Sequence, residues 1–147
     1  MKEFRKWLSG KITAQNTSVV QKEKPLTSFS FNGANKYPAL STLHTALIKI
    51  DKIADTTLPV FRNAFLGKKI DNRKEKIYWT GTIPELKHLI NSLIECNKIS
   101  SPKNKWQIAA QLFQNPKGNY TVEQLTYNTK GVSEKYRNNI DYIVSKV

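Results

Sequence analysis

The strongest structural signal in this sequence is a helix start within residues 76–99, KIYWTGTIPELKHLINSLIECNKI. The Thr82 hydroxyl can accept a hydrogen bond from the Glu85 N–H, and the Glu85 carboxylate can accept one from the Thr82 N–H. Pro84 falls in the first turn, where its missing N–H costs nothing. Apolar residues then recur at helical spacing: Ile83, Leu86, Leu89, Ile90, Leu93 and Ile94. This stretch therefore predicts an amphipathic helix that packs against another part of the chain.

Two further helices are expected before this stretch. Apolar residues at steps of three and four, starting at Leu40, predict a helix that ends before Pro59, because the residue before a proline avoids helical geometry. A second short helix is predicted over residues 59–66. Upstream of both, residues 11–39 are rich in polar side chains and show only a fragment of strand-like alternation near residues 28–31. We expect this segment to be an irregular connector with one short strand at most.

Three short helices are expected after the central one. Asn104, Thr121 and Ser133 are suitable N-cap residues, and Gln124 forms a second capping box with Thr121. Residues 115–118, with the sequence NPKG, predict a tight turn between the first and the second of these helices.

Together these elements predict a mainly α-helical fold, a small helical bundle with at most one or two short strands. We expect a basic, partly irregular N-terminal arm at residues 1–39 and a helical hairpin with a charged loop at residues 40–75. Residues 76–147 are expected to form a helical C-terminal domain. Four short helices over residues 82–147, packed around one apolar core, are typical of helix-turn-helix domains.

The net charge of the chain is its largest compositional anomaly. The 147 residues include 24 Lys and Arg against 11 Asp and Glu, so the formal net charge is +13. The excess of positive charge is spread along the whole chain rather than gathered in one tail. A protein this basic is expected to associate with polyanions, of which nucleic acid is the commonest.

Several functional classes lack support in the sequence. It has no apolar run long enough to span a membrane and no signal-peptide pattern at its start, so a cytoplasmic protein without a membrane partner is expected. Cys96 is the only cysteine, and no cluster of metal-ligating residues is apparent. Paired carboxylates and a glycine-rich phosphate loop are also missing. We therefore expect a protein that is not an enzyme and that has no cofactor, metal or small-molecule substrate.

The candidate nucleic-acid-binding residues lie in the last three helices. In a DNA-reading arrangement, residues 121–129 form the recognition helix, where amide and hydroxyl groups can face base edges. The base-facing candidates are Gln124, Tyr127, Asn128 and Thr129. The phosphate-binding candidates are Lys117, Lys130, Lys135 and Arg137. The connection at residues 114–120 is longer than the usual three- or four-residue turn of a helix-turn-helix.

A second class of function is compatible with the same residues. A small helical module can bind a protein, or a second copy of itself, through an apolar patch around Trp79 and Trp106. Such binding would persist at high salt, and reversing the charges of Lys130, Lys135 and Arg137 would leave it unchanged.

The central stretch resembles the signature segment of the RteC family of Bacteroidetes. Its W-T-G element is Trp79-Thr80-Gly81, and its L-x-x-L-I-x-x-L pattern comprises Leu86, Leu89, Ile90 and Leu93. The run KWQIAAQLF, residues 105–113, falls where that family has its next helix. The resemblance covers about residues 60–147. It implies a helical protein with a winged-helix-like C-terminal part that binds duplex DNA, as a transcriptional regulator or accessory factor of a mobile genetic element.

Overall fold

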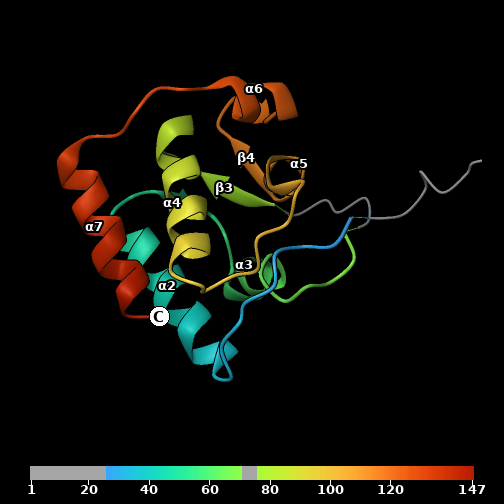
Figure 1. Cartoon of the computed structure of the whole chain (residues 1–147), viewed down its shortest axis with the longest axis vertical. Coiled ribbons are helices and arrows are strands. Elements are labelled where there is room, and N and C mark those ends of the chain that lie inside the picture. Colours follow the sequence, from blue (N-terminus) through green and yellow to red (C-terminus); the bar gives the residue numbers. More distant parts are fainter. Residues whose placement is uncertain (1–25, 71–75) are drawn as a thin grey trace, which may run out of the picture.

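The computed structural model describes residues 26–70 and 76–147, in which very short strands are interspersed among the helices (Figure 1). The elements follow in the order α2 (Lys36–Lys49), β2 (Ile53–Ala54), α3 (Leu58–Asn63), β3 (Ile77–Trp79), α4 (Ile83–Glu95), α5 (Lys105–Leu112), β4 (Phe113–Asn115), β5 (Gly118–Asn119), α6 (Val122–Tyr127) and α7 (Glu134–Ser145).

The four strands form one mixed sheet, so the expected helical bundle with at most two short strands is wrong. The strand order is β2-β3-β4-β5. β2 pairs with β3 antiparallel, β3 with β4 parallel, and β4 with β5 antiparallel. Each strand has only two or three residues. Alternation cannot be recognised over such lengths, and the partners of β3 are far away in the sequence, which is why the local pattern did not reveal the sheet.

The expected helix-turn-helix and winged-helix arrangement is also wrong. α5 and α6 are not joined by a tight turn, because the β4–β5 hairpin lies between them. The NPKG sequence is the turn of that hairpin, with Asn115 paired to Gly118. α4 and α5 instead connect two neighbouring parallel strands, β3 and β4.

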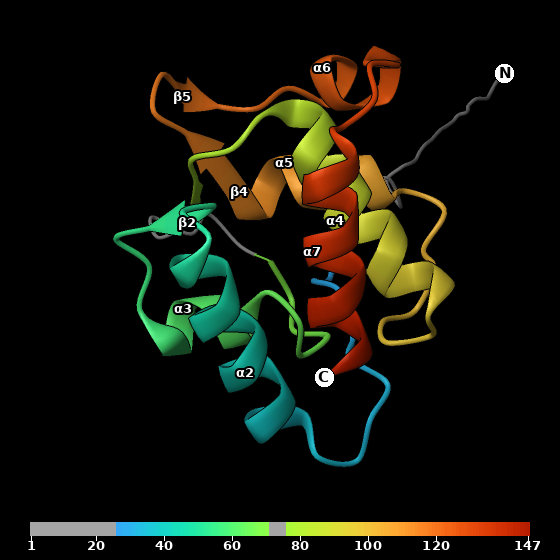
Figure 2. The same cartoon turned by 90° about the vertical axis from the view of Figure 1, so that its left-hand side faces the viewer.

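The central helix has the start that the sequence predicts. The Glu85 N–H donates to the Thr82 hydroxyl at 3.3 Å, and the Thr82 N–H donates to the Glu85 carboxylate at 2.9 Å. The buried side of α4 comprises Leu86, Leu89, Ile90, Ser92 and Leu93. α4 lies beside α7, and the connection between α6 and α7 passes over its N-terminal end (Figure 2). The capping box of α6 and the Ser133 cap of α7 are likewise confirmed.

The helix predicted from Leu40 ends earlier than expected. α2 stops at Lys49, and Asp51 adopts a left-handed backbone conformation with φ 61°. Aspartate tolerates this conformation because its short side chain can bond locally. The chain then enters β2, where Ile53 is buried against the sheet instead of extending the helix stripe.

One hydrophobic core joins the segments on both sides of α4. It extends from Phe29 to Val144 and includes residues of each helix from α2 to α7. Phe29 and Phe31 in the irregular connector are only 1% and 4% exposed. The Phe31 N–H donates to the Phe65 carbonyl at 2.9 Å, and the Asn32 N–H donates to the Lys98 carbonyl at 2.8 Å. Residues 29–32 are therefore held between the end of α3 and the end of α4, while the expected arm at residues 1–25 lies outside the described residues.

The buried tyrosine that follows β5 gives the fold a pH dependence. Tyr120 is 5% exposed, and burial raises the pKa of its hydroxyl to about 12. An unfolded tyrosine titrates near pH 10, so between these values the folded state holds a proton that the unfolded state has lost. The contribution of Tyr120 to the free energy of unfolding is therefore complete below pH 10 and is lost as the pH rises through 12. At about 1.4 kcal/mol per pKa unit, the total loss is roughly 2–3 kcal/mol. Urea unfolding of the wild type and of Tyr120→Phe from pH 9 to 12 should show this loss only in the wild type, and parallel pH profiles would contradict it.

Candidate nucleic-acid interface

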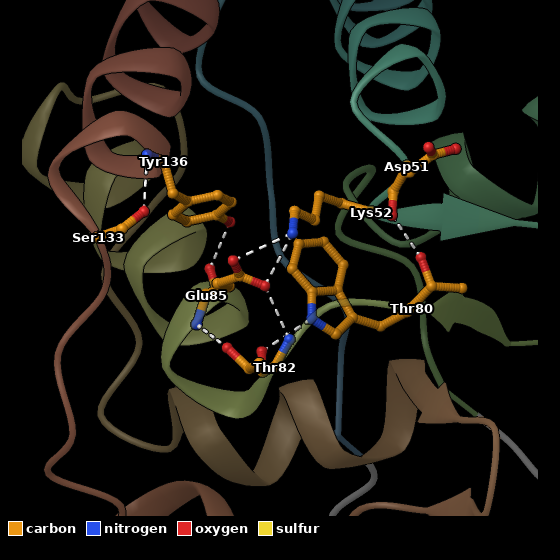
Figure 3. A network of polar contacts seen from close by, with 8 residues as sticks. Asp51, Lys52, Thr80, Thr82, Glu85, Ser133 and Tyr136 are labelled. Atoms are coloured by element: carbon orange, nitrogen blue, oxygen red, sulfur yellow. Dashed lines mark hydrogen bonds and ion pairs between the residues drawn. The ribbon is translucent and has the colours of Figure 1, made fainter.

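The W-T-G motif belongs to a polar network at the start of α4 (Figure 3). Trp79 is fully buried, and its indole N–H donates to the Thr82 carbonyl at 2.9 Å. The Lys52 ammonium donates to both oxygens of the Glu85 carboxylate, each at 3.0 Å. The Tyr136 hydroxyl donates to the Glu85 main-chain carbonyl at 2.7 Å. The network ties α4 to β3, to the start of β2 and to α7, so the motif is structural and Trp79 is not part of a surface patch.

Gly81 is enclosed by this network, which leads to a stability prediction. A Cβ atom at Gly81 would lie 2.6 Å from a Glu85 carboxylate oxygen and 3.0 Å from the Trp79 indole nitrogen. Gly81→Ala is expected to lower the free energy of unfolding by about 1–3 kcal/mol, because overpacking displaces bonded groups. Gly131→Ala is the matched control, since a Cβ there would have no neighbour within 4 Å. Both free energies of unfolding are measured in urea. Equal values for the two variants would contradict the tight enclosure of Gly81 by the network.

A hollow at the N-terminal half of α4 brings cationic and amide side chains together. It has a volume of about 220 Å³ and lies between α4, the α6–α7 connection and the first turns of α7. We call it the cationic hollow; its lining residues are Pro84, Lys87, His88, Asn91, Asn128, Thr129, Lys130, Gly131, Val132 and Arg137. Four of the predicted site residues, Asn128, Thr129, Lys130 and Arg137, therefore share one surface.

Local hydrogen bonds fix the shape of the cationic hollow. The Lys87 ammonium donates to the Asn128 carbonyl at 2.6 Å, which holds the α6–α7 connection against α4. The Asn128 side chain accepts a bond from the Lys130 N–H at 3.1 Å. At the start of α7, the Arg137 N–H donates to the Ser133 carbonyl at 3.0 Å. The backbone around the cations is thus already ordered before any ligand binds.

Electrostatics in the cationic hollow favour an anion. Burial, and in second place the nearby charge of Lys105, lowers the pKa of Lys87. Lys130 and Arg137 have exposed side chains at the same site. A bound anion would reduce the repulsion among these cations, so the hollow is suited to phosphate or carboxylate oxygens.

A histidine, a serine and a carboxylate meet beside the cationic hollow without forming a catalytic triad. His88 Nε2 lies 3.2 Å from an Asp141 carboxylate oxygen and 3.4 Å from the Ser92 hydroxyl. The Ser92 hydroxyl donates to the same Asp141 oxygen at 3.1 Å. A triad needs serine and aspartate on opposite ring nitrogens, whereas here one nitrogen faces both. The cluster therefore joins α4 to α7 and does not activate the serine.

The other predicted site residues lie outside the cationic hollow. Lys117 is exposed in the turn of the β4–β5 hairpin. Gln124 is a capping residue, since its side-chain carbonyl accepts a bond from the Thr121 N–H at 2.9 Å. Lys135 lines a separate hollow of about 380 Å³ with Lys52 and other residues. Burial and the Glu85 carboxylate raise the pKa of Tyr136 in that second hollow.

Sequence reasoning missed the contribution of α4 to the site. Lys87, His88 and Asn91 lie off its apolar stripe, which is the one signal that they face a different surface. Nothing in their spacing indicates that the α6–α7 connection covers them. Among the described residues, no group of three His, Cys, Asp or Glu side chains is placed to hold a metal ion. None of the described helices has the length and apolar character needed to cross a membrane.

Comparison with known proteins identifies no relative of this chain. No protein-family model matches it, and neither a curated protein nor a solved structure gives a significant match. The resemblance to the RteC family stays a prediction.

Proposed function

We propose that this protein binds duplex DNA through the cationic hollow and the exposed cations around it. In the role that the RteC-like motif implies, it acts as a transcriptional regulator or accessory factor of a mobile genetic element. The main support for the proposal is that Lys87 from α4 lines the same hollow as Lys130 and Arg137, which come from the last quarter of the chain.

The chemistry of the cationic hollow fits a nucleic-acid backbone. Lysine and arginine side chains bind phosphate oxygens and set the position of a protein on a duplex. Asn91 and Asn128 place amide groups beside the cations. The net charge of +13 adds a long-range attraction to the duplex. We assign no base-reading role to Gln124, because capping already uses its carbonyl.

The alternative is a helical module that binds a protein and has no enzymatic activity. The patch predicted around Trp79 and Trp106 does not support it, because Trp79 is fully buried. Large apolar side chains are exposed elsewhere: Tyr37 is 56% exposed, Tyr127 76% and Tyr142 65%. These aromatic side chains favour a protein partner or a second copy of the chain as the next candidate.

Fluorescence anisotropy with duplex DNA across a salt series separates the two functions. One duplex carries the region upstream of the protein's own gene and the other a scrambled sequence. If the three cations of the hollow each contact a phosphate, log Kd should change with log salt with a slope of about 3. Tighter binding of the native duplex supports a regulator. Equal affinity and equal salt slope for the two duplexes support sequence-independent DNA binding. No binding at low salt would overturn the proposal and direct the search to a protein partner.

A further inference from the structure

Two lysines from different helices share one aromatic ring next to the cationic hollow. The Lys87 ammonium lies 5.0 Å from the centre of the Trp106 ring, and the Lys105 ammonium lies 4.8 Å from it. Both distances are typical of cation–π contacts. Because the two nitrogens lie against the same ring, they are at most about 10 Å apart. We call Lys87 and Lys105 the lysine pair.

The acceptors of the lysine pair are neutral. Lys87 donates to the Asn128 carbonyl at 2.6 Å, and Lys105 donates to the Asn91 side-chain oxygen at 2.8 Å. Among residues 26–70 and 76–147, Lys52 forms a salt bridge with Glu85, whereas neither Lys87 nor Lys105 forms one with a carboxylate. The two ammonium groups are thus near enough for their charges to interact, and their hydrogen-bond acceptors do not neutralise them. Each acceptor bond is weaker than a charge-assisted bond to an anion.

We propose that the lysine pair binds one phosphate group, with both ammonium groups donating to its oxygens. Trp106 orients the two side chains, and the partly buried position strengthens the attraction of a dianion or a phosphodiester. Lys87 and Asn91 also line the cationic hollow, so this site extends the proposed interface onto α5. For a phosphate in duplex DNA the inference rests on the proposed function; a free phosphate would be the other source of the same chemistry.

The first test measures duplex binding by a variant with Lys87→Gln and Lys105→Gln. The slope of log Kd against log salt should fall by about one, and Kd should rise about 5- to 10-fold at 0.1 M salt. Lys36→Gln with Lys49→Gln removes the same charge from α2 and should change Kd less than 2-fold. A variant with both lysines changed to arginine should keep the wild-type slope. The inference is overturned if the double glutamine variant binds like the α2 control.

The second test uses the indole N–H signal of Trp106 in a nitrogen–proton correlation spectrum, assigned with Trp106→Phe. Inorganic phosphate is titrated against chloride at matched ionic strength, and the duplex is titrated separately. A shift with both, or with the duplex alone, supports a backbone phosphate at the pair. A shift with inorganic phosphate alone supports a free phosphate ligand at the pair, and the anisotropy titration then decides separately whether the duplex binds elsewhere on the protein. No shift with either ligand overturns the inference.

Folding is checked separately so that a damaged variant is not mistaken for a lost site. Each variant is compared with the wild type by thermal unfolding. Lys105→Gln alone serves if the double variant is unfolded, because the Lys105 ammonium contacts Asn91 and Trp106 rather than the α6–α7 connection. This single variant should lose the phosphate-induced shift of Trp106, and an unchanged shift would contradict the proposal.

Discussion

Reversing the charges of Lys130 and Arg137 together is expected to weaken duplex binding about 100-fold or more at 0.1 M salt. Both side chains are exposed and line the cationic hollow, so glutamates at these positions would replace two phosphate donors by two repelling carboxylates. The fold should tolerate the change, because neither side chain forms a salt bridge with another described residue. Fluorescence anisotropy with the upstream duplex measures the loss.

A matched control separates this local effect from the overall charge. Lys49→Glu with Lys68→Glu changes the net charge by the same amount at exposed positions that do not line the hollow. The control is expected to weaken binding less than 10-fold through the long-range field alone. If both double variants lose equal affinity, net charge rather than the hollow carries the interaction.

Replacing Trp79 by alanine is expected to lower the free energy of unfolding by about 3–5 kcal/mol, as for other large aromatic residues in a protein core. The Trp79 ring is fully buried and lies edge-on to Phe113 of β4, with ring centres 6.2 Å apart. The variant also loses the indole bond to the Thr82 carbonyl, next to the start of α4. Urea unfolding followed by circular dichroism gives the change.

Tyr127→Ala is the control for this large effect, because the Tyr127 side chain is 76% exposed on α6. Its unfolding free energy should stay within about 0.5 kcal/mol of the wild type. A stability loss at Trp79 no greater than this would contradict the placement of the W-T-G motif in the core.

The sequence predicted those features of the fold that neighbouring residues determine. The capping boxes of α4 and α6 are examples, because Thr82 and Glu85, or Thr121 and Gln124, are only three positions apart. The sheet could not be predicted in this way, since Ile77 of β3 pairs with Phe113 of β4 across two helices. β-Pairing over such distances leaves almost no pattern in strands of two or three residues.

In the candidate site, too, sequence neighbours could be predicted and long-range contacts could not. Asn128, Lys130 and Arg137 are close in sequence, and the structure places all three at the cationic hollow. Their roles in nucleic-acid binding stay a prediction. Lys87 joins them only because α4 packs beneath the α6–α7 connection, a tertiary contact that has no local signal. Gln124 was expected to face bases although its spacing from Thr121 already indicated a cap. A residue used for capping has less freedom to read a ligand.

The most direct test of the account is a titration of the isotopically labelled protein with duplex DNA, followed by nitrogen–proton correlation spectra. The account predicts that the largest shifts occur in residues 128–137 and at Lys87 and Asn91, and that added salt reverses them. Shifts confined to α2 and α3, or a spectrum that the duplex leaves unchanged at low salt, would contradict it.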